Sequence, residues 1–213
     1  MRTSEGAAEN RTQRRKAQTR QKLVDAARAM LADGTAQRAS IEEITERADV
    51  GFGSFYNHFT SKDDLYAAAV TEVLGIVGAL LDDLHREVGD PVAAYAVSVR
   101  LSVRGALRRP QLAQILVRQG MAYLDDPHGP AAYIQRDIDA AVATGRLHVE
   151  HPKIALAVTL GSVLATLRLA LADPDLAAEP VDEQLAEHLL LMFGLPADQA
   201  HRLATFPLPT RAG

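Results

Sequence analysis

The sequence predicts an all-α protein of about nine to ten helices, with a small N-terminal helical domain followed by a larger one. Aromatic residues make up only 5% of its 213 residues, and no segment alternates apolar and polar residues over the length of a strand. Glycine and proline interrupt the chain at intervals that suit helices. With 47% hydrophobic and 23% charged residues the chain can bury a sizeable core, which excludes intrinsic disorder.

The first helix is expected over residues 12–33. Apolar residues recur at helical spacing from Leu23 to Leu31, and most of the basic residues lie off that stripe. Gly34 stands where a glycine commonly ends a helix. Residues 1–11, which precede this helix, are expected to form a disordered tail.

Two short helices are expected next, over 41–48 and 52–59. Ser40 and Glu43 have the spacing of a capping box, which marks the start of the first. Asp49 tolerates the left-handed backbone conformation that can end it. Only about three to four residues then join the two helices, which is the pattern of a helix-turn-helix motif.

The remaining helices follow from the same kinds of signal. Ser61 and Asp64 form a second capping box, which predicts a long helix over 62–88. Beyond it, prolines open helices and glycines or prolines close them. These helices are expected over 92–109, 111–119, 131–144, 152–172 and 180–193, with a short one near 198–205. The proline-rich residues 206–213 are expected to form a second disordered tail.

The formal net charge of −4 conceals two segments of opposite sign. Residues 11–28 hold seven basic residues and one acid, a balance of +6, whereas residues 67–213 hold 12 basic and 17 acidic residues, a balance of −5. A polyanion is therefore expected to bind only the N-terminal part. The chain contains no cysteine, which excludes disulfides and thiolate chemistry and fits a reducing cytoplasm.

No membrane span is expected. The longest uncharged apolar stretch, 154–167, has 14 residues, whereas a spanning helix needs about 20. Residues 1–22 contain no apolar run and do not resemble a signal peptide. We therefore expect a cytoplasmic protein in which this stretch is a buried helix.

The sequence lacks the common motifs of enzymes and metal sites. It has no Gly-x-Ser-x-Gly elbow, no glycine-rich phosphate loop and no His-Glu-x-x-His sequence. Its histidines show no His-x-x-x-His spacing that would place two metal ligands on one helical face. Neither enzymatic activity nor a metal or other cofactor is expected.

The helix-turn-helix pattern extends into a longer and more specific motif. Residues 40–65 read SIEEITERADVGFGSFYNHFTSKDDL. Over about 12–69, the sequence closely resembles the N-terminal domain of the tetracycline-repressor (TetR) family of transcriptional regulators. It departs from the family pattern at Asp49, where glycine is commoner, and at Thr45, where alanine is commoner. Neither departure disturbs the geometry of the motif, because aspartate tolerates the left-handed conformation.

The resemblance implies that residues 52–58 enter the major groove of DNA as a recognition helix. Phe55 and Phe59 are expected in the core. For Phe52 two readings stay open, since its ring either is exposed toward a thymine methyl or packs on the first helix. The other residues implied at DNA are Gly53, Ser54 and Asn57 at base edges or nearby phosphates, Ser40, Tyr56, His58 and Lys62 at phosphates, and Arg14 and Arg15 in a basic arm along the backbone or minor groove.

The resemblance also implies how the chain divides. Residues 12–61 would form the DNA-binding domain, with the helix-turn-helix motif at about 40–59, and residues 62–205 would form a ligand-binding and dimerisation domain. The residues expected to line the ligand site are Tyr95, Val99, Arg100, Val103, Arg104, Arg118, Met121, Tyr123 and Ile134. Alternatively, the arginines of this set pair with acids such as Asp82, Asp83 or Glu87, or lie at the surface.

A dimer interface is expected on the last two long helices, 152–172 and 180–193. The residues assigned to it are Leu160, Leu164, Leu167, Leu185, Leu189 and Met192. The alternative is that these apolar stripes face the core of their own protomer.

Together these expectations describe a homodimeric, ligand-responsive regulator, a repressor that binds a near-palindromic double-stranded operator and is released by a small, mainly apolar molecule. The alternative is a helical adaptor that binds another protein and no DNA. That alternative gives no purpose to the basic and helix-turn-helix residues from Arg11 to Lys62.

Overall fold

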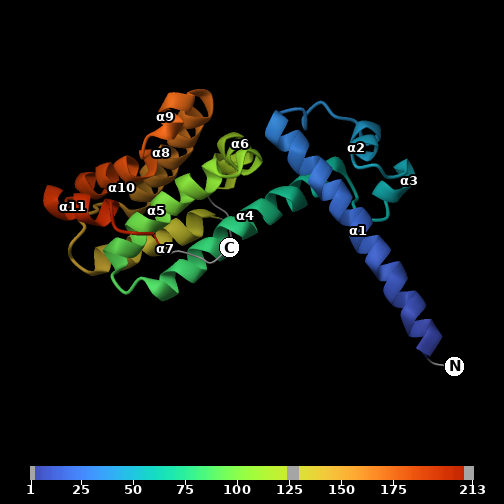
Figure 1. The fold of residues 1–213 in the computed structure, drawn as a ribbon, viewed down its shortest axis with the longest axis horizontal. Helices are drawn as coiled ribbons and strands as arrows, with labels where there is room; N and C mark the ends of the chain where they lie inside the picture. Colours follow the sequence, from blue (N-terminus) through green and yellow to red (C-terminus); the bar gives the residue numbers. More distant parts are fainter. Residues whose placement is uncertain (1–2, 124–129, 209–213) are drawn as a thin grey trace. The chain divides into compact units, whose positions relative to one another are not determined.

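The computed structural model describes residues 3–123 and 130–208, and throughout these residues the regular structure is helical, as predicted (Figure 1). The chain forms two compact units, which we call unit 1 (Met1–Glu72) and unit 2 (Val73–Gly213). Their boundary lies inside helix α4 (Lys62–Glu87), further along the chain than the position between 61 and 62 expected from the sequence. The first half of α4 contacts α1, because the Tyr66 hydroxyl donates to Met30 Sδ and Glu72 lies 3.5 Å from the Arg28 guanidinium.

Unit 1 begins with the long helix α1 (Thr3–Asp33). The helix starts well before the expected residue 12, so the expected tail over 1–11 is helical from Thr3 onward; alanines and glutamates with no proline favour that extension. The predicted stop is confirmed. Gly34 has φ +81°, and the N–H groups of Gly34 and Thr35 both donate to the Met30 carbonyl.

Helix α2 (Ile41–Arg47) starts at the predicted capping box. The Glu43 N–H donates to Ser40 Oγ at 3.1 Å, and the Ser40 N–H donates to Glu43 Oε2 at 2.7 Å. Asp49 takes the predicted left-handed conformation, with φ +51°. Lys22 of α1 holds this residue by donating from Nζ to its carboxylate at 2.9 Å and to its carbonyl at 3.2 Å.

Helix α3 (Phe52–Phe55) is a single turn and ends earlier than the predicted residue 59. The N–H groups of His58 and Phe59 both donate to the Phe55 carbonyl, so the chain leaves the helix in a tight turn. The second predicted capping box is only half formed. The Asp64 N–H donates to Ser61 Oγ, but the Asp64 carboxylate accepts from Thr60.

Unit 2 is built around helix α5 (Pro91–Leu107), which contacts four other long helices of the unit and the short α11. Proline lies in the first turn of α5, α6, α8 and α9, where its missing N–H costs nothing. The further elements are α6 (Pro110–Gln119), the 3₁₀ helix η1 (Gly120–Tyr123), α7 (Pro130–Ala143), α8 (Pro152–Ala172), α9 (Pro174–Ala178), α10 (Val181–Met192) and α11 (Ala197–Ala204).

Two short elements of unit 2 escaped prediction, η1 and α9. Helix α9 is capped by Asp173, whose carboxylate accepts from the N–H groups of Asp175 and Leu176. An Asp-Pro pair is as typical of a turn as of a helix start, so the sequence did not separate the two. The expected tail over 206–213 is described only as far as Leu208, and its first residue, Phe206, is tied to α5.

Helix α8 is the one helix in 3–123 and 130–208 that is long and apolar enough to cross a membrane, by length and composition alone. It contacts α5, α6, α7 and α10, and its buried residues include Thr159, Leu160 and Leu167. Its close packing extends to the end of α6, because a Cβ added at Gly120 would lie 2.9 Å from a methyl of Leu164. These contacts identify α8 as a core helix of unit 2.

Candidate functional site

The surface of α3 and the turn after it carries large side chains that remain exposed. Phe52 is 53% exposed and Tyr56 is 57% exposed, whereas Phe55 and Phe59 are buried, as predicted. Of the two readings for Phe52, the structure therefore supports the exposed one. The Tyr56 ring meets Phe55 edge-on, with 5.3 Å between the ring centroids, so a buried residue fixes an exposed one.

Basic side chains of α1 lie next to this surface. The Arg20 guanidinium stacks over the Phe59 ring, 5.2 Å from its centroid. Partial burial, together with the nearby charges of Lys16 and Arg20, lowers the pKa of His58 below its ordinary value. Arg14 and Arg15 are exposed further toward the N-terminus of the same helix. Unit 1 thus presents aromatic, amide and cationic groups together.

Two residues expected at phosphates have internal partners that the sequence did not predict. Lys62 is half-buried, and its Nζ donates to the Ala39 carbonyl at 2.6 Å, which ties the start of α4 to the chain before α2. The Ser40 side chain and backbone N–H are both bonded to Glu43. The capping box therefore uses groups that had been assigned to a phosphate.

Gly53 and Asn57 lie exposed on the α3 surface, and Ser54 is half-buried. A Cβ added at Gly53 would meet no atom within 4 Å, so no contact inside the chain requires glycine there. Glycine within a helix costs about 0.5–1 kcal/mol relative to alanine. Its presence at an open position fits a surface that another molecule approaches closely.

The core of unit 2 contains two buried hydrogen-bonded pairs of polar side chains. Tyr95 of α5 is 1% exposed, and its hydroxyl lies 2.8 Å from Thr159 Oγ1 of α8. Burial raises the pKa of Tyr95, so the phenol stays protonated. Ser98 of α5 donates to Asp137 Oδ2 of α7 at 2.6 Å. Three helices thus bring polar groups into an apolar interior.

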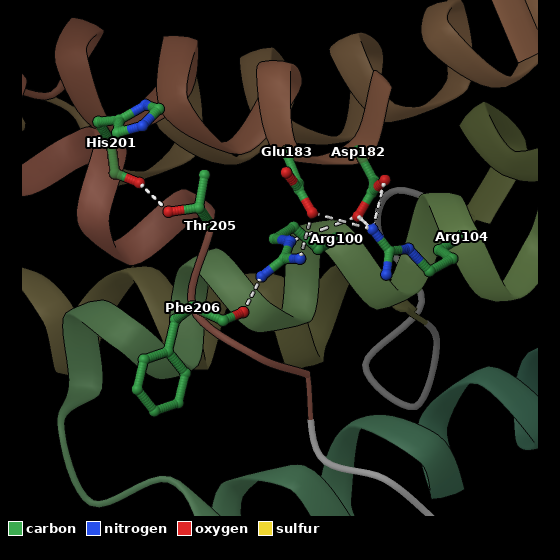
Figure 2. Close-up of polar contacts among 7 residues, drawn as sticks. All are labelled: Arg100, Arg104, Asp182, Glu183, His201, Thr205 and Phe206. Carbon is green, nitrogen blue, oxygen red and sulfur yellow. Dashed lines mark hydrogen bonds and ion pairs between the residues drawn. The ribbon is translucent and has the colours of Figure 1, made fainter. Parts of the chain in front are cut away.

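A second polar cluster joins α5 to the start of α10 (Figure 2). Arg100 is only 2% exposed and donates to Asp182 Oδ2 at 3.3 Å, to Glu183 Oε1 at 2.9 Å and to the Phe206 carbonyl. Arg104 lies 2.9 Å from the Asp182 carboxylate and 3.2 Å from that of Glu183. Burial alone would lower the pKa of Arg104, but its bonds to the two acids outweigh burial and raise it.

In this cluster Arg100 and Arg104, both expected at a ligand, have partners within the chain. Their guanidinium groups bind acids of the same chain, which agrees with the alternative that they form ion pairs. The partners found are Asp182 and Glu183 of α10, which packs against α5. The side chains of the acids named from the sequence, Asp82, Asp83 and Glu87, lie outside the described residues.

The other residues expected at a ligand fall into three groups. Tyr95, Val99, Val103 and Ile134 are buried in the core of unit 2. Arg118 is exposed and Met121 is 54% exposed, so neither lines that core. The side chain of Tyr123 lies outside the described residues. Sequence reasoning missed Ser98, Asp137 and Thr159, although Asp137 interrupts an apolar stripe formed by Ile134, Ile138 and Ala141, which was a usable signal.

Most residues assigned to a dimer interface are buried within the chain itself. Leu160, Leu164, Leu167 and Leu189 are each at most 8% exposed, and Leu185 is half-buried. Of that set, only Met192 is largely exposed, at 52%. The exposed apolar side chains of α8 and α10 are instead Ile154, Leu169, Leu171, Leu191 and Met192.

Two family models match the sequence. Residues 23–69 match the model of bacterial regulatory proteins of the tetR family, and residues 90–205, more than half of the chain, match the model of the tetracyclin repressor-like C-terminal domain. The first match contains the whole α2–α3 surface, and the second contains α5 and every side chain of both polar clusters. No protein with a curated description matches the sequence.

Solved structures resemble the fold over nearly its whole length. RolR in complex with resorcinol is 30% identical, with a TM-score of 0.71, and the match covers 92% of this chain and 98% of that one. SmeT, the repressor of a Stenotrophomonas maltophilia multidrug efflux pump, is 23% identical with a TM-score of 0.71, covering 90% and 97% of the two chains. A TetR-family regulator from Pectobacterium atrosepticum is 23% identical with a TM-score of 0.59, covering 85% and 95%.

Proposed function

Since the chain belongs to the tetR family of bacterial regulatory proteins, we propose that it is a homodimeric repressor that leaves its operator DNA when a small molecule binds unit 2. The family assignment makes it a DNA-binding transcriptional regulator with a ligand-binding C-terminal domain. Repression, the kind of effector, the contact residues and a cytoplasmic location are the parts that we propose.

One observation carries the DNA-binding part of the proposal. The exposed surface formed by Phe52, Tyr56 and Asn57 lies on α3 and its following turn, and Lys16 and Arg20 of α1 are near enough to lower the pKa of His58 beside it. Cations placed beside an exposed helix-turn-helix surface suit a duplex whose phosphates flank the major groove. Arg14 and Arg15 extend this positive charge along the same helix.

Variants of this surface separate base readout from phosphate contact. Asn57→Ala is expected to change which sequences bind, whereas Tyr56→Ala is expected to weaken binding to every duplex. Lys62→Ala should weaken binding to every duplex and reduce the slope of log affinity against log salt by about one, the value of one phosphate contact. The variant also loses the bond to the Ala39 carbonyl. Dissociation constants measured on a panel of duplexes at several salt concentrations test the assignment. Equal losses on every duplex for all three variants would contradict it.

The exposed apolar side chains of α8 and α10 support a dimer. Ile154, Leu169 and Leu191 are between 39% and 63% exposed, on helices whose opposite faces are already buried. A second copy of the chain would remove these surfaces from water. Leu169→Glu should therefore give monomers in sedimentation velocity, whereas Arg168→Glu, at the exposed neighbouring position, should remain dimeric.

The effector site is proposed in the core of unit 2. Val99, Val103 and Ile134 offer apolar contacts, and the hydroxyls of Tyr95, Ser98 and Thr159 offer hydrogen bonds to a few polar atoms. The related RolR, at 30% identity, was solved with resorcinol, a small aromatic ring with two hydroxyls. A compact, mainly apolar molecule with one or two hydroxyl groups is therefore the first class to test.

A thermal-shift screen that starts from resorcinol and related phenols tests this site. A true effector raises the melting temperature and releases DNA over the same concentration range. Thr159→Val, which keeps the volume but removes one hydroxyl, should weaken the shift. A panel that leaves both the melting temperature and DNA binding unchanged would contradict the proposed ligand class.

Helix α4 is the proposed route between effector and DNA. It runs without interruption from Lys62 to Glu87 and contains the boundary between the two units. We expect effector binding to favour a population in which the two recognition helices of a dimer no longer match successive major grooves. Because the chain has no cysteine, Asp63→Cys supplies a unique spin-label position in the first turn of α4. An effector that released DNA while leaving the label-to-label distance unchanged would contradict this route.

A mobility-shift assay on the DNA that flanks the protein's own coding region tests the proposed operator at low cost. A salt-sensitive shift on that DNA supports the proposal, and no shift on any duplex contradicts it.

A further inference from the structure

The segment that forms α3 and its flanking turns carries no fully charged side chain of its own. Residues 50–60 contain no lysine, arginine, aspartate or glutamate, and His58 is their only titratable side chain besides Tyr56. Guanine is read most often by arginine or lysine, and cytosine by aspartate or glutamate. The groups that this segment exposes are instead an aromatic ring, a phenol and an amide, at Phe52, Tyr56 and Asn57.

These exposed groups suit an A·T base pair. Asparagine can bond the N6 and N7 edge of adenine, and an apolar side chain can pack on the 5-methyl group of thymine, which is the one apolar group in the major groove. Phe52 at the start of α3 and Asn57 in the turn after it are both exposed, and the buried Phe55 lies between them in the sequence.

Phe52 is held in position before any DNA arrives. Its ring meets Tyr56 edge-on, with 5.9 Å between centroids and 70° between planes, and Tyr56 in turn meets the buried Phe55 at 5.3 Å. Because this column of three rings fixes the exposed one, little side-chain freedom is lost on binding. The open space beside Gly53 allows a base edge to approach the backbone next to the ring.

From these contacts we infer that Phe52 determines sequence specificity by packing its ring on a thymine methyl in each half of the operator, within A·T pairs that Asn57 also reads. The inference rests on the proposed DNA-binding function and adds to it the identity of the base. It assigns Phe52 to direct readout of a methyl group, with no hydrogen bond involved.

The experiment begins with duplexes selected by the full-length protein from a random library. In the selected consensus, each thymine is replaced in turn by deoxyuridine, which removes only the 5-methyl group. In each half-site we expect one thymine at which the replacement raises the dissociation constant about fourfold. This factor corresponds to the free energy of burying one methyl group. Replacing both should have an effect of about fifteenfold.

Variants then connect that methyl group to Phe52. With Phe52→Ala the ratio between the thymine and deoxyuridine duplexes should fall to about one, and with Phe52→Leu it should be intermediate. Phe206→Ala is the matched control, because it removes an equally exposed ring, 51% against 53%, from unit 2. It should leave the ratio unchanged. Unchanged melting temperatures would show that the exposed ring of Phe52 is not needed for folding.

Each outcome has a distinct meaning. A consensus with no A·T pair at corresponding positions of its two halves, or a wild-type protein indifferent to deoxyuridine, overturns the inference while DNA binding stands. A Phe52→Ala variant that keeps the fourfold ratio assigns the methyl contact to another residue and also overturns it. A protein that selects no duplex contradicts the proposed function itself. Replacing the sensitive thymine by cytosine should lower the affinity, because it removes both the methyl group and the adenine that pairs with thymine. Replacing it by 5-methylcytosine should lower the affinity less, because the methyl group is kept and only the adenine bound by Asn57 is lost.

Discussion

Two arginines and a tyrosine of unit 1 lie in environments opposite to those of an arginine and a tyrosine of unit 2. In unit 1, Arg14 and Arg15 are exposed and Tyr56 is 57% exposed, whereas in unit 2 Arg100 is 2% exposed and Tyr95 is 1% exposed. The difference lies in the partners that the chain supplies. Arg100 finds two carboxylates on α10. Within the described residues the guanidinium groups of Arg14 and Arg15 make no hydrogen bond or ion pair, and only the Arg15 carbonyl accepts a bond, from Thr19 Oγ1 at 3.0 Å. Arg100 therefore stabilises unit 2, whereas Arg14 and Arg15 of unit 1 are available to bind a polyanion.

The largest expected effect comes from breaking the buried cluster. Arg100→Met should lower the free energy of unfolding by about 3–5 kcal/mol, because Asp182 would stay buried with half of its ion pairs lost. Arg15→Met, at an exposed position, should change it by at most about 0.5 kcal/mol. Urea unfolding measures both, and similar values for the two would remove the contrast between the units.

The complementary change removes exposed charge from unit 1. Arg14→Ala combined with Arg15→Ala should reduce the slope of log affinity against log salt by up to about two, with no loss of stability. The exposed pair Arg108 and Arg109 in unit 2 provides a matched control, since it also consists of two adjacent arginines. If the control pair changed DNA affinity as much, the positive charge of α1 would have no special role.

A smaller effect separates structural from functional polar residues within unit 1. Ser40→Ala should cost about 1 kcal/mol of stability, because Glu43 would lose one side of the capping box, and Ser40→Thr should retain most of it. Asn57→Ala should leave stability unchanged and alter the preferred sequence. Thermal unfolding of the three variants decides whether the two residues differ in this way.

The smallest effect is a pH dependence at His58. Its pKa is lowered first by partial burial and then by Lys16 and Arg20, so the unfolded chain binds a proton more readily than the folded one. The free energy of unfolding is therefore highest above pH 6.5, the ordinary pKa of histidine, and decreases as the pH falls through the pKa of His58 in the folded chain. DNA phosphates oppose this shift, so DNA affinity should rise as the pH falls. His58→Gln should remove both trends, and melting curves and binding titrations between about pH 5.5 and pH 8 measure them.

Local signals predicted several of the helix boundaries in unit 1. The Ser40–Glu43 box, the positive φ of Asp49 and the stop at Gly34 all involve contacts within a few residues, and all three are confirmed. Helix α3 was predicted too long because its end depends on a turn whose hydrogen bonds return to the Phe55 carbonyl. The pattern of exposed residues did not reveal that turn.

Long-range pairing was not predictable in the same way. Arg100 and Asp182 are 82 residues apart, and nothing near either residue identifies the other. The leucines assigned to a dimer interface show a related limit, since helical spacing shows that Leu160 and Leu164 share a face but not whether that face meets α6 or a second chain. The tetR-family motif, in contrast, indicated the surface that we propose to bind DNA, and the structure added which of its side chains are exposed.

The most direct test of the central claim is the salt dependence of binding between the full-length protein and its selected duplex, followed by fluorescence anisotropy. We predict a linear fall of log affinity with log salt, and a slope that becomes shallower when Arg14 and Arg15 are replaced but not when Arg108 and Arg109 are. A duplex affinity that does not respond to salt, or a library from which no sequence is enriched, would contradict the assignment of unit 1 as the operator-binding unit.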